Sequence, residues 1–316
     1  MRGRSVGSRD RAAARPPLPD PASPIGVILV SSHRAGGPET VAVVGAAGQT
    51  GWAVTAALAR RGVPVRAVVR SAAAAERAVG AGASSTVFGD LADPSSLVPA
   101  FADAGAVHVV PPAFDAAEEE FVGNAVDAAE AVGVRLFGYH SVLQPDDPHL
   151  PHHLRKNRAE VRIRRSSLPW VALRPCMYAQ TPLRLLRGDG EPRLPFGTGG
   201  RFSPIDLLDV AEATARVLTE PGYIYGIYEL AGPDHLTMAE MSALVTGSSE
   251  PGEPRTAAET LRGRGFMKWA AISDLAAMFA HYESHGLFGS PAVAGHLLGR
   301  APTAFADVVG RLGANV

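Results

Sequence analysis

The chain has 316 residues, a formal net charge of −1, 46% hydrophobic residues and 19% charged residues, which is the composition of a soluble globular protein. The near-neutral charge gives no electrostatic reason to expect a nucleic acid or an anionic membrane as partner, and no apolar run approaches the roughly 18 residues that cross a bilayer. The single cysteine, Cys176, excludes an intramolecular disulfide and a cysteine-based zinc site, so we expect a reducing, cytoplasmic setting.

Residues 1–38 differ in composition from the rest of the chain. Several arginines precede a proline-rich stretch from Pro16 to Pro24, and no helical or strand period is sustained. Such a segment buries too little apolar surface to fold, so we predict a disordered, dispensable tail. A targeting peptide, or a start codon placed too far upstream, is the alternative.

From Thr40 onward, short β-branched runs alternate with Ala- and Leu-rich stretches of helical period. The predicted strands are 40–44, 64–69, 86–88, 107–110, 134–139 and 170–173. The predicted helices are 49–61, an Ala-rich helix ending at 79, 94–102, 116–131 and 150–165. This alternation implies parallel pairing through right-handed crossovers. The sequence therefore predicts the α/β class, with a Rossmann doubly wound parallel sheet over residues 39–174.

After Arg174 the alternation decays. A Gly- and Pro-rich loop at 188–200 precedes predicted strands at 202–205 and 224–230, with a helix at 207–218 between them. Thr237 and Glu240 have the spacing of a capping box at a helix start, and the chain from about Ala257 is mostly helical. We expect residues 175–316 to form a smaller C-terminal substrate lobe that packs on the first domain, with crossings of the chain between the two left open.

The most informative segment joins the first predicted strand to the first helix. Gly45, Gly48 and Gly51 are spaced three apart directly after the hydrophobic run 41–44. In a strand–turn–helix context, the first glycine permits the tight turn, the second lets a pyrophosphate approach, and the third allows close helix–strand packing. The free amides of the helix start then bind the anion. The segment predicts a dinucleotide site formed by these residues: Gly45, Ala47, Gly48, Gln49, Thr50 and Gly51.

The end of the second strand indicates which dinucleotide is bound. A carboxylate there would bind the ribose diol of NAD, whereas an arginine suits the 2′-phosphate of NADP. Arg70 and Ser71 follow the strand, and no acid appears before Glu76. We therefore expect NADP(H) as the preferred cofactor, with NAD(H) as the alternative. Asp90, after the third strand, either accepts from the adenine amino group or caps the next turn.

Together these segments resemble the NmrA-like branch of the atypical short-chain dehydrogenase/reductase superfamily. The resemblance extends in order over roughly residues 40–312. The matching segments are Val68-Val69-Arg70, Gly89-Asp90-Leu91, Lys156-Asn-Arg-Ala-Glu160, Leu173-Arg174-Pro175, Phe202-Ser-Pro-Ile-Asp206 through Asp209-Val210, Tyr228-Glu-Leu-Ala-Gly232-Pro233, Met278-Phe-Ala-His-Tyr282 with Gly286, and Leu298-Gly-Arg300-Ala-Pro302. Some members of this family are NAD(P)H-dependent reductases of quinones, dyes or other small unsaturated molecules. Others are dinucleotide-binding redox sensors that regulate a protein partner.

The resemblance also implies candidates for a catalytic group. Tyrosine-dependent members of the superfamily use Ser, Tyr and Lys, with Tyr and Lys four residues apart on one helix. This chain has Ser141 after the fifth strand and Lys156 on the next helix, but His152 stands in the tyrosine's place. A histidine of ordinary pKa could donate a proton near neutrality, and Lys156 would bind the nicotinamide ribose. The structural alternatives are a partly exposed His152 and a solvated Lys156.

Other residues near the predicted pocket have weaker signals. Tyr139 and His140 end the fifth strand at the edge of the sheet where ligands bind. The Asp- and His-rich stretch 146–153 has metal-ligand residue types, but its two prolines are typical of a loop, and we expect no metal. Cys176 is expected to be a small buried residue rather than a redox-responsive thiol. Four apolar or aromatic residues of the second lobe either surround a flat ligand or belong to its core: Met177, Tyr178, Phe196 and Phe202.

The sequence therefore favours an NAD(P)H-dependent oxidoreductase that transfers a hydride to a small quinone, enone or carbonyl substrate. The alternative is a non-catalytic NAD(P)-binding redox sensor that binds a protein partner, which the missing tyrosine favours. A relative of the nucleotide-sugar epimerases is a weaker hypothesis, because it too would need that tyrosine.

Overall fold

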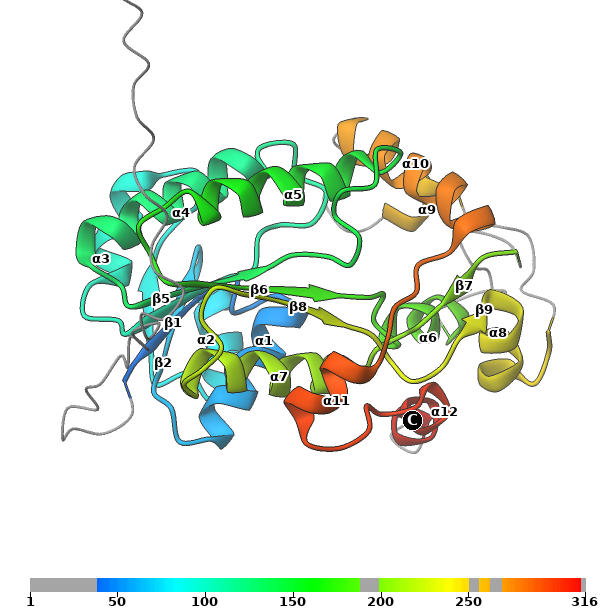
Figure 1. Ribbon diagram of the computed structural model, residues 1–316. Coiled ribbons are helices and arrows are strands. Elements are labelled where there is room, and N and C mark those ends of the chain that lie inside the picture. Colours follow the sequence, from blue (N-terminus) through cyan, green and yellow to red (C-terminus); the bar gives the residue numbers. More distant parts are fainter. Residues whose placement is uncertain (1–38, 188–198, 250–255, 262–268, 314–316) are drawn as a thin grey trace, which may run out of the picture. The chain divides into compact units, whose positions relative to one another are not determined.

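The computed structural model describes residues 39–187, 199–249, 256–261 and 269–313, and residues 38–316 form one compact unit. The predicted tail at 1–38 and Phe196 lie outside the described residues. A seven-stranded sheet of order β3-β2-β1-β4-β5-β6-β8 forms the centre of the unit, and every neighbouring pair of its strands is parallel. The predicted Rossmann sheet is confirmed (Figure 1).

The strands are short, and those inside the sheet are mostly buried because helices cover both of its faces, whereas the two edge strands are more exposed. Those of the large sheet are β1 (Val41–Val44), β2 (Val65–Val69), β3 (Ser85–Phe88), β4 (Ala106–Val109), β5 (Leu136–His140), β6 (Trp170–Pro175) and β8 (Gly226–Leu230). The antiparallel pair β7 (Arg201–Phe202) and β9 (Leu236–Thr237) forms a separate small sheet.

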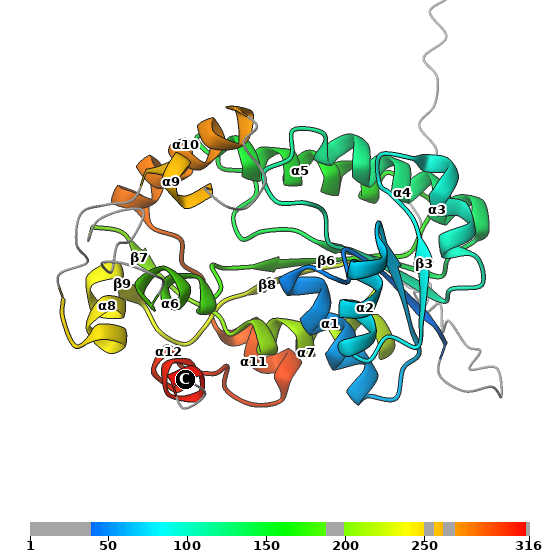
Figure 2. The ribbon, with the colours of Figure 1, turned by 180° about the vertical axis from the view of Figure 1, so that it is seen from behind.

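Helices cover the large sheet on both sides. The helices of the described residues are α1 (Gln49–Arg60), α2 (Ala72–Gly80), α3 (Pro94–Phe101), α4 (Glu118–Val132), α5 (Pro151–Arg164), α6 (Gln180–Arg187), α7 (Leu207–Thr219), α8 (Met238–Thr246), α9 (Ala257–Leu261), α10 (Trp269–His285), α11 (Ala292–Leu298) and α12 (Phe305–Gly313). Helices α3, α4 and α5 lie on one face, and α1, α2, α7 and α11 lie on the other (Figures 1 and 2). The predicted capping box at the start of α8 is confirmed, since Thr237 and Glu240 bond each other's backbone amides.

Each face of the sheet has its own hydrophobic core, because successive strand residues point to opposite faces. In β1, Val41 and Val43 belong to the core under α1 and α7, whereas Ala42 and Val44 belong to the core under α3, α4 and α5. The first core continues into the C-terminal region through Phe202, and the sheet and that region therefore share buried apolar surface.

The chain returns to the sheet after the boundary drawn at residue 174. Strand β8 pairs with β6 from Val171↔Gly226 to Pro175↔Leu230, and α7 packs beside α1. The segment predicted as a strand at 224–230 thus contains an edge strand of the large sheet. The local sequence does not predict that β8 pairs with β6, because pairing between strands more than 50 residues apart leaves no local pattern.

The remaining helices gather beyond the carboxyl ends of the strands. Helices α6, α8, α9 and α10 lie at this end in both views (Figures 1 and 2). Helix α6, which sequence analysis did not predict, buries Leu183 and Leu186. In the described part of the chain, no helix is both long and apolar enough to cross a membrane.

Candidate functional site

The glycine-rich turn between β1 and α1 has the geometry that a phosphate-binding turn requires. Gly45 has a φ of +78°, and a Cβ atom there would lie 2.5 Å from the carbonyl oxygen of Val110. A Cβ atom on Gly51 would overlap the carbonyl oxygen of Gly45. Both positions therefore exclude a side chain, Gly45 for its conformation and Gly51 for close packing of α1 on the turn.

The start of α1 leaves its backbone amides without a side-chain cap. Gly48 is its N-cap residue, no side chain caps the helix, and no acid lies in its first turn. Its first amides and the positive end of its dipole therefore remain for a ligand. Ala47, Gln49 and Thr50 line the adjoining cavity together with Gly48.

This cavity has a volume of about 1220 Å³ and follows the carboxyl edge of the sheet. At one end it is lined by Arg70 and Asp90, and at the other by residues of α10. Of the predicted cofactor and catalytic residues, Gly51 alone is not part of the lining, since it lies behind Gly45.

At the first end, Arg70 is the group that the sequence assigned to the 2′-phosphate. Its side chain is 65% exposed, and its guanidinium lies 4.0 Å from the Asp90 carboxylate. Asp90 also accepts a hydrogen bond from the backbone N–H of Ala92 at 3.0 Å. It therefore caps the turn, which is one of the two roles predicted for it. Arg77 lines the same end and adds a second cation near Arg70.

Lys156 is buried in the middle of the cavity wall rather than solvated. Its Nζ donates to Oε1 of Glu118 at 2.7 Å and to the carbonyl oxygen of His140 at 3.3 Å. The Tyr139 hydroxyl donates to the same Oε1 at 2.7 Å. Glu118 is fully buried in the first turn of α4. Sequence analysis missed this carboxylate because α4 and α5 are far apart in the chain, and only their packing brings Glu118 to Lys156.

Tyr139 and His140, the last two residues of β5, point to different places. Tyr139 is buried in the core under α3, α4 and α5 and is not part of the cavity lining. His140 lines the cavity. The alternation of a β-strand explains this difference, and of the two, His140 is the one that a ligand can reach.

His152 lies on the cavity wall but differs from the residue that sequence analysis expected. It is 8% exposed, and its ring packs against Phe114 at a tilt of 36° with centroids 4.4 Å apart. Burial lowers the pKa of His152 well below its ordinary value, and Lys156 lowers it further. The expected histidine of ordinary pKa is therefore wrong: His152 is a neutral imidazole at pH 7 and a poor proton donor. The partly exposed alternative is wrong too.

Ser141 is held by a second buried carboxylate. Its Oγ donates to Oε1 of Glu160 at 2.6 Å, and Glu160 also accepts from Arg174 at 2.9 and 2.7 Å. Glu160 is 1% exposed. The segments Lys156–Glu160 and Leu173–Pro175, which the family resemblance had singled out, are thus joined through this ion pair.

A chain of three polar side chains at the cavity was not predicted from the sequence. The Tyr178 hydroxyl lies 2.6 Å from Nε2 of His140 and 3.0 Å from Oγ1 of Thr50. Burial raises the pKa of Tyr178 and, with His108 and Lys156, lowers the pKa of His140 well below its ordinary value. Both groups are therefore neutral, and the phenol keeps its proton. The sequence named Tyr178 only as an aromatic group, because its partners lie on α1 and β5.

The far end of the cavity is apolar. Met278, Phe279 and Tyr282 of α10 line it opposite Met177. Phe202 is fully buried in the core. Cys176 is buried as expected: its Sγ donates to the carbonyl oxygen of Leu287 at 3.2 Å, and burial raises its pKa to about 12, which argues against a reactive thiolate.

Comparisons with known proteins agree with this geometry. A family described as NAD(P)H-binding matches residues 45–221. Over 215 residues the chain is 31% identical to the NAD(P)H azoreductase of Xenophilus azovorans, covering 66% of this chain and 73% of that protein. It is 26% identical to quinone oxidoreductase 2 of Escherichia coli strain K12, covering 86% of this chain and 98% of that protein.

Solved structures share the fold. The NADPH-dependent quinone oxidoreductase of Escherichia coli, crystallised with NADPH, superposes with a TM-score of 0.72 at 24% identity, covering 86% of this chain and 99% of that one. Triphenylmethane reductase of Citrobacter sp., crystallised with NADP(H), gives a TM-score of 0.71 at 23% identity over 86% and 99% of the two chains. From the family match, which covers more than half of the chain, the chain belongs to the NAD(P)H-binding family.

Proposed function

We propose that the protein is an NADPH-dependent oxidoreductase that passes a hydride to a small, flat, unsaturated acceptor such as a quinone or an azo compound. The observation that carries the proposal is the continuity of the cavity from the phosphate-binding turn to the apolar residues of α10. Its volume of about 1220 Å³ exceeds the usual range of about 300–1,000 Å³ for a single ligand pocket. There is room for a dinucleotide and a second molecule.

The two ends of the cavity suit the two molecules. The amides of the α1 N-terminus would hold the diphosphate, which directs the nicotinamide toward the carboxyl ends of β4 and β5. When bound, the cofactor supplies the hydride. Met278 and Phe279 offer the sulfur and aromatic surfaces that pack well on a flat conjugated acceptor. The relatives named as azoreductase and quinone oxidoreductase act on molecules of this shape.

Reduction of such an acceptor by a hydride also needs a proton. His152 is neutral, so we assign proton donation to the Tyr178 hydroxyl, which lines the cavity. His140 and Thr50 fix the position of this hydroxyl by bonds of 2.6 and 3.0 Å. Tyr178 would give its proton to the reduced acceptor and be reprotonated through Thr50 from solvent, while neutral His140 orients it.

Arg70 and Arg77 support NADPH over NADH. Both line the adenosine end of the cavity, where a 2′-phosphate would find two guanidinium groups. The Asp90 carboxylate at this end already caps a turn.

The test is oxidation of NADPH by the full-length protein with a panel of small quinones and azo dyes. We expect turnover, and we expect Tyr178→Phe to lower kcat by about 10²-fold or more while the Kd for NADPH changes little. Tyr225→Phe, the same change at an exposed tyrosine outside the cavity lining, is the control. Tight NADPH binding without turnover of any acceptor would exclude the proposal.

Tight NADPH binding without turnover would favour a redox sensor, and one feature of the site is consistent with that function. Lys156 and Ser141 are both engaged by buried carboxylates, Glu118 and Glu160. A sensor needs these groups only to shape the site, and its partner would be a protein that distinguishes the reduced from the oxidised cofactor.

A further inference from the structure

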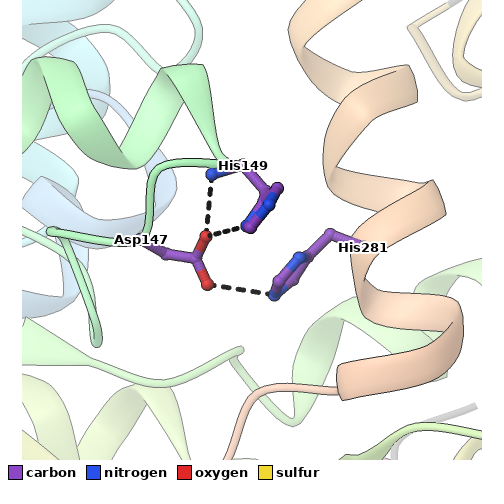
Figure 3. Close-up of side chains that lie close together, drawn as sticks. All are labelled: Asp147, His149 and His281. Atoms are coloured by element: carbon purple, nitrogen blue, oxygen red, sulfur yellow. Dashed lines mark hydrogen bonds and ion pairs between the residues drawn. The ribbon is translucent and has the colours of Figure 1, made fainter.

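Three side chains outside the cavity lining meet between the loop before α5 and helix α10. They are Asp147, His149 and His281, and they point toward one another (Figure 3). Nδ1 of His149 lies 3.1 Å from Oδ1 of Asp147, and Nε2 of His281 lies 3.2 Å from Oδ2. One ligand atom from each residue lies within 4.8 Å of the others.

This set has the chemistry of a transition-metal site. Two imidazoles and one carboxylate are ligands that Zn²⁺ prefers, at about 2.0–2.2 Å each. Donor atoms at that distance around a tetrahedral ion are roughly 3.3 Å apart, and one ligand atom from each of the three residues already lies within 4.8 Å of the others. We propose that Asp147, His149 and His281 form a Zn²⁺ site with three protein ligands and a water molecule in the fourth position.

The local backbone also orients the set. The backbone N–H of His149 donates to Oδ1 of Asp147 at 2.8 Å, which fixes the carboxylate against its own loop. The ring of His281 is held between two other rings, since it stacks on His149 at 5.7 Å and on His285 at 4.4 Å between centroids. Supporting contacts of this kind are what orient metal ligands in proteins.

The place of the site indicates what the metal does. Helix α10 provides Met278, Phe279 and Tyr282 to the cavity, and it is fastened to the α5 region by the Arg155–Asp274 ion pair and a 3.0 Å bond between His153 and Tyr282. A metal held by Asp147, His149 and His281 would strengthen the contact that Asp147 and His281 already make between the same two segments. It would fix the cover of the cavity without taking part in the chemistry. The inference does not depend on the proposed activity.

The experiment is a calorimetric titration of the tag-free, full-length, metal-stripped protein with Zn²⁺, in the absence of NADPH. We expect saturation at one Zn²⁺ per chain and a rise in Tm of about 5 °C at a hundredfold excess over Kd. His281→Ala and His149→Ala should each weaken binding at least about tenfold. Far-ultraviolet circular dichroism and NADPH affinity, which should stay unchanged in both variants, show that the fold is intact.

His296→Ala is the matched control, because this exposed histidine of α11 is not a member of the cluster. It should bind Zn²⁺ as the unchanged chain does. Two results would overturn the proposal: no saturable binding by the unchanged chain, or an equal loss of binding in His296→Ala and His281→Ala, which would mean adventitious surface histidines. Neither result bears on NADPH oxidation, so failure here and failure of the proposed activity can be told apart.

Discussion

The phosphate-binding turn and the middle of the cavity wall are built in opposite ways. The turn is made of backbone: Gly45, Gly48 and the first amides of α1 come from seven consecutive residues, 45–51. The wall around Lys156 is made of side chains from α4, α5 and β5, joined by the buried carboxylates Glu118 and Glu160. A site made of backbone groups tolerates substitution of its side chains but not of its glycines. A site made of buried charged side chains is destabilised when one charge loses its partner.

The largest effect should come from breaking the wall. Glu118→Ala leaves the Lys156 ammonium buried without its carboxylate, and this should lower the free energy of unfolding by about 3–5 kcal/mol in urea. The neighbour Glu119→Ala is the control, because its pair with Arg158 is half exposed and contributes less than about 1 kcal/mol. Equal losses in the two variants would show that Lys156 does not depend on Glu118.

A change in the turn should have a smaller effect on stability and a specific effect on the cofactor. In Gly51→Ala the new Cβ meets the Gly45 carbonyl, so we expect a loss of about 1–3 kcal/mol together with NADPH binding at least about tenfold weaker. Gly123→Ala in α4, where a Cβ meets nothing within 4 Å, should instead be neutral or stabilising by up to about 1 kcal/mol. Unchanged NADPH affinity in Gly51→Ala would remove the turn from the site.

The buried histidines behind the wall should make stability depend on pH. Burial lowers the pKa of His108 to about 3 from its ordinary value of 6.5. Between these two values, His108 binds a proton in the unfolded chain but not in the folded chain. The contribution of neutral His108 to the free energy of unfolding is therefore complete above pH 6.5. It is lost as the pH falls toward 3, by up to about 1.4 kcal/mol per pH unit.

His108→Leu removes this titration. Neither ring nitrogen of His108 has a hydrogen-bond partner among the described residues, so the substitution should be tolerated near neutral pH. Urea unfolding at a series of pH values between about 6 and about 4 should then show a shallower decline than in the unchanged chain. An identical slope would mean that His108 is protonated or hydrated in the fold.

The smallest effect concerns the exposed end of the cavity. Arg70→Glu should weaken NADPH binding by about tenfold, because an exposed guanidinium contributes less to a phosphate than a buried one. NADH, which lacks the 2′-phosphate, is the internal control and should bind as before. If fluorescence titration shows unchanged NADPH affinity, the second cation Arg77 would be the group that selects NADP.

Much of this protein was predictable from local pattern. Strands and helices of the sheet up to β6 follow from runs and periods within a few residues, and the glycine spacing identified the turn because tight turns need glycine wherever they occur. The capping box before α8 and the buried Cys176 were likewise correctly predicted. The return of β8 to the sheet and the helix α6 were not, since neither has a local signal that distinguishes it.

The side-chain chemistry of the site escaped the sequence for a physical reason. The pKa of His152 depends on burial and on the charge of Lys156, and the role of Tyr178 depends on Thr50 and His140, 128 and 38 residues away. The cluster of Asp147, His149 and His281 shows the same limit, because the first two are close in the sequence while His281 joins them only when α10 packs over the loop. A site made of backbone groups depends on consecutive residues, so the sequence alone predicts it. Burial, partnership and charge balance are properties of packing, and they arise only when distant segments come together.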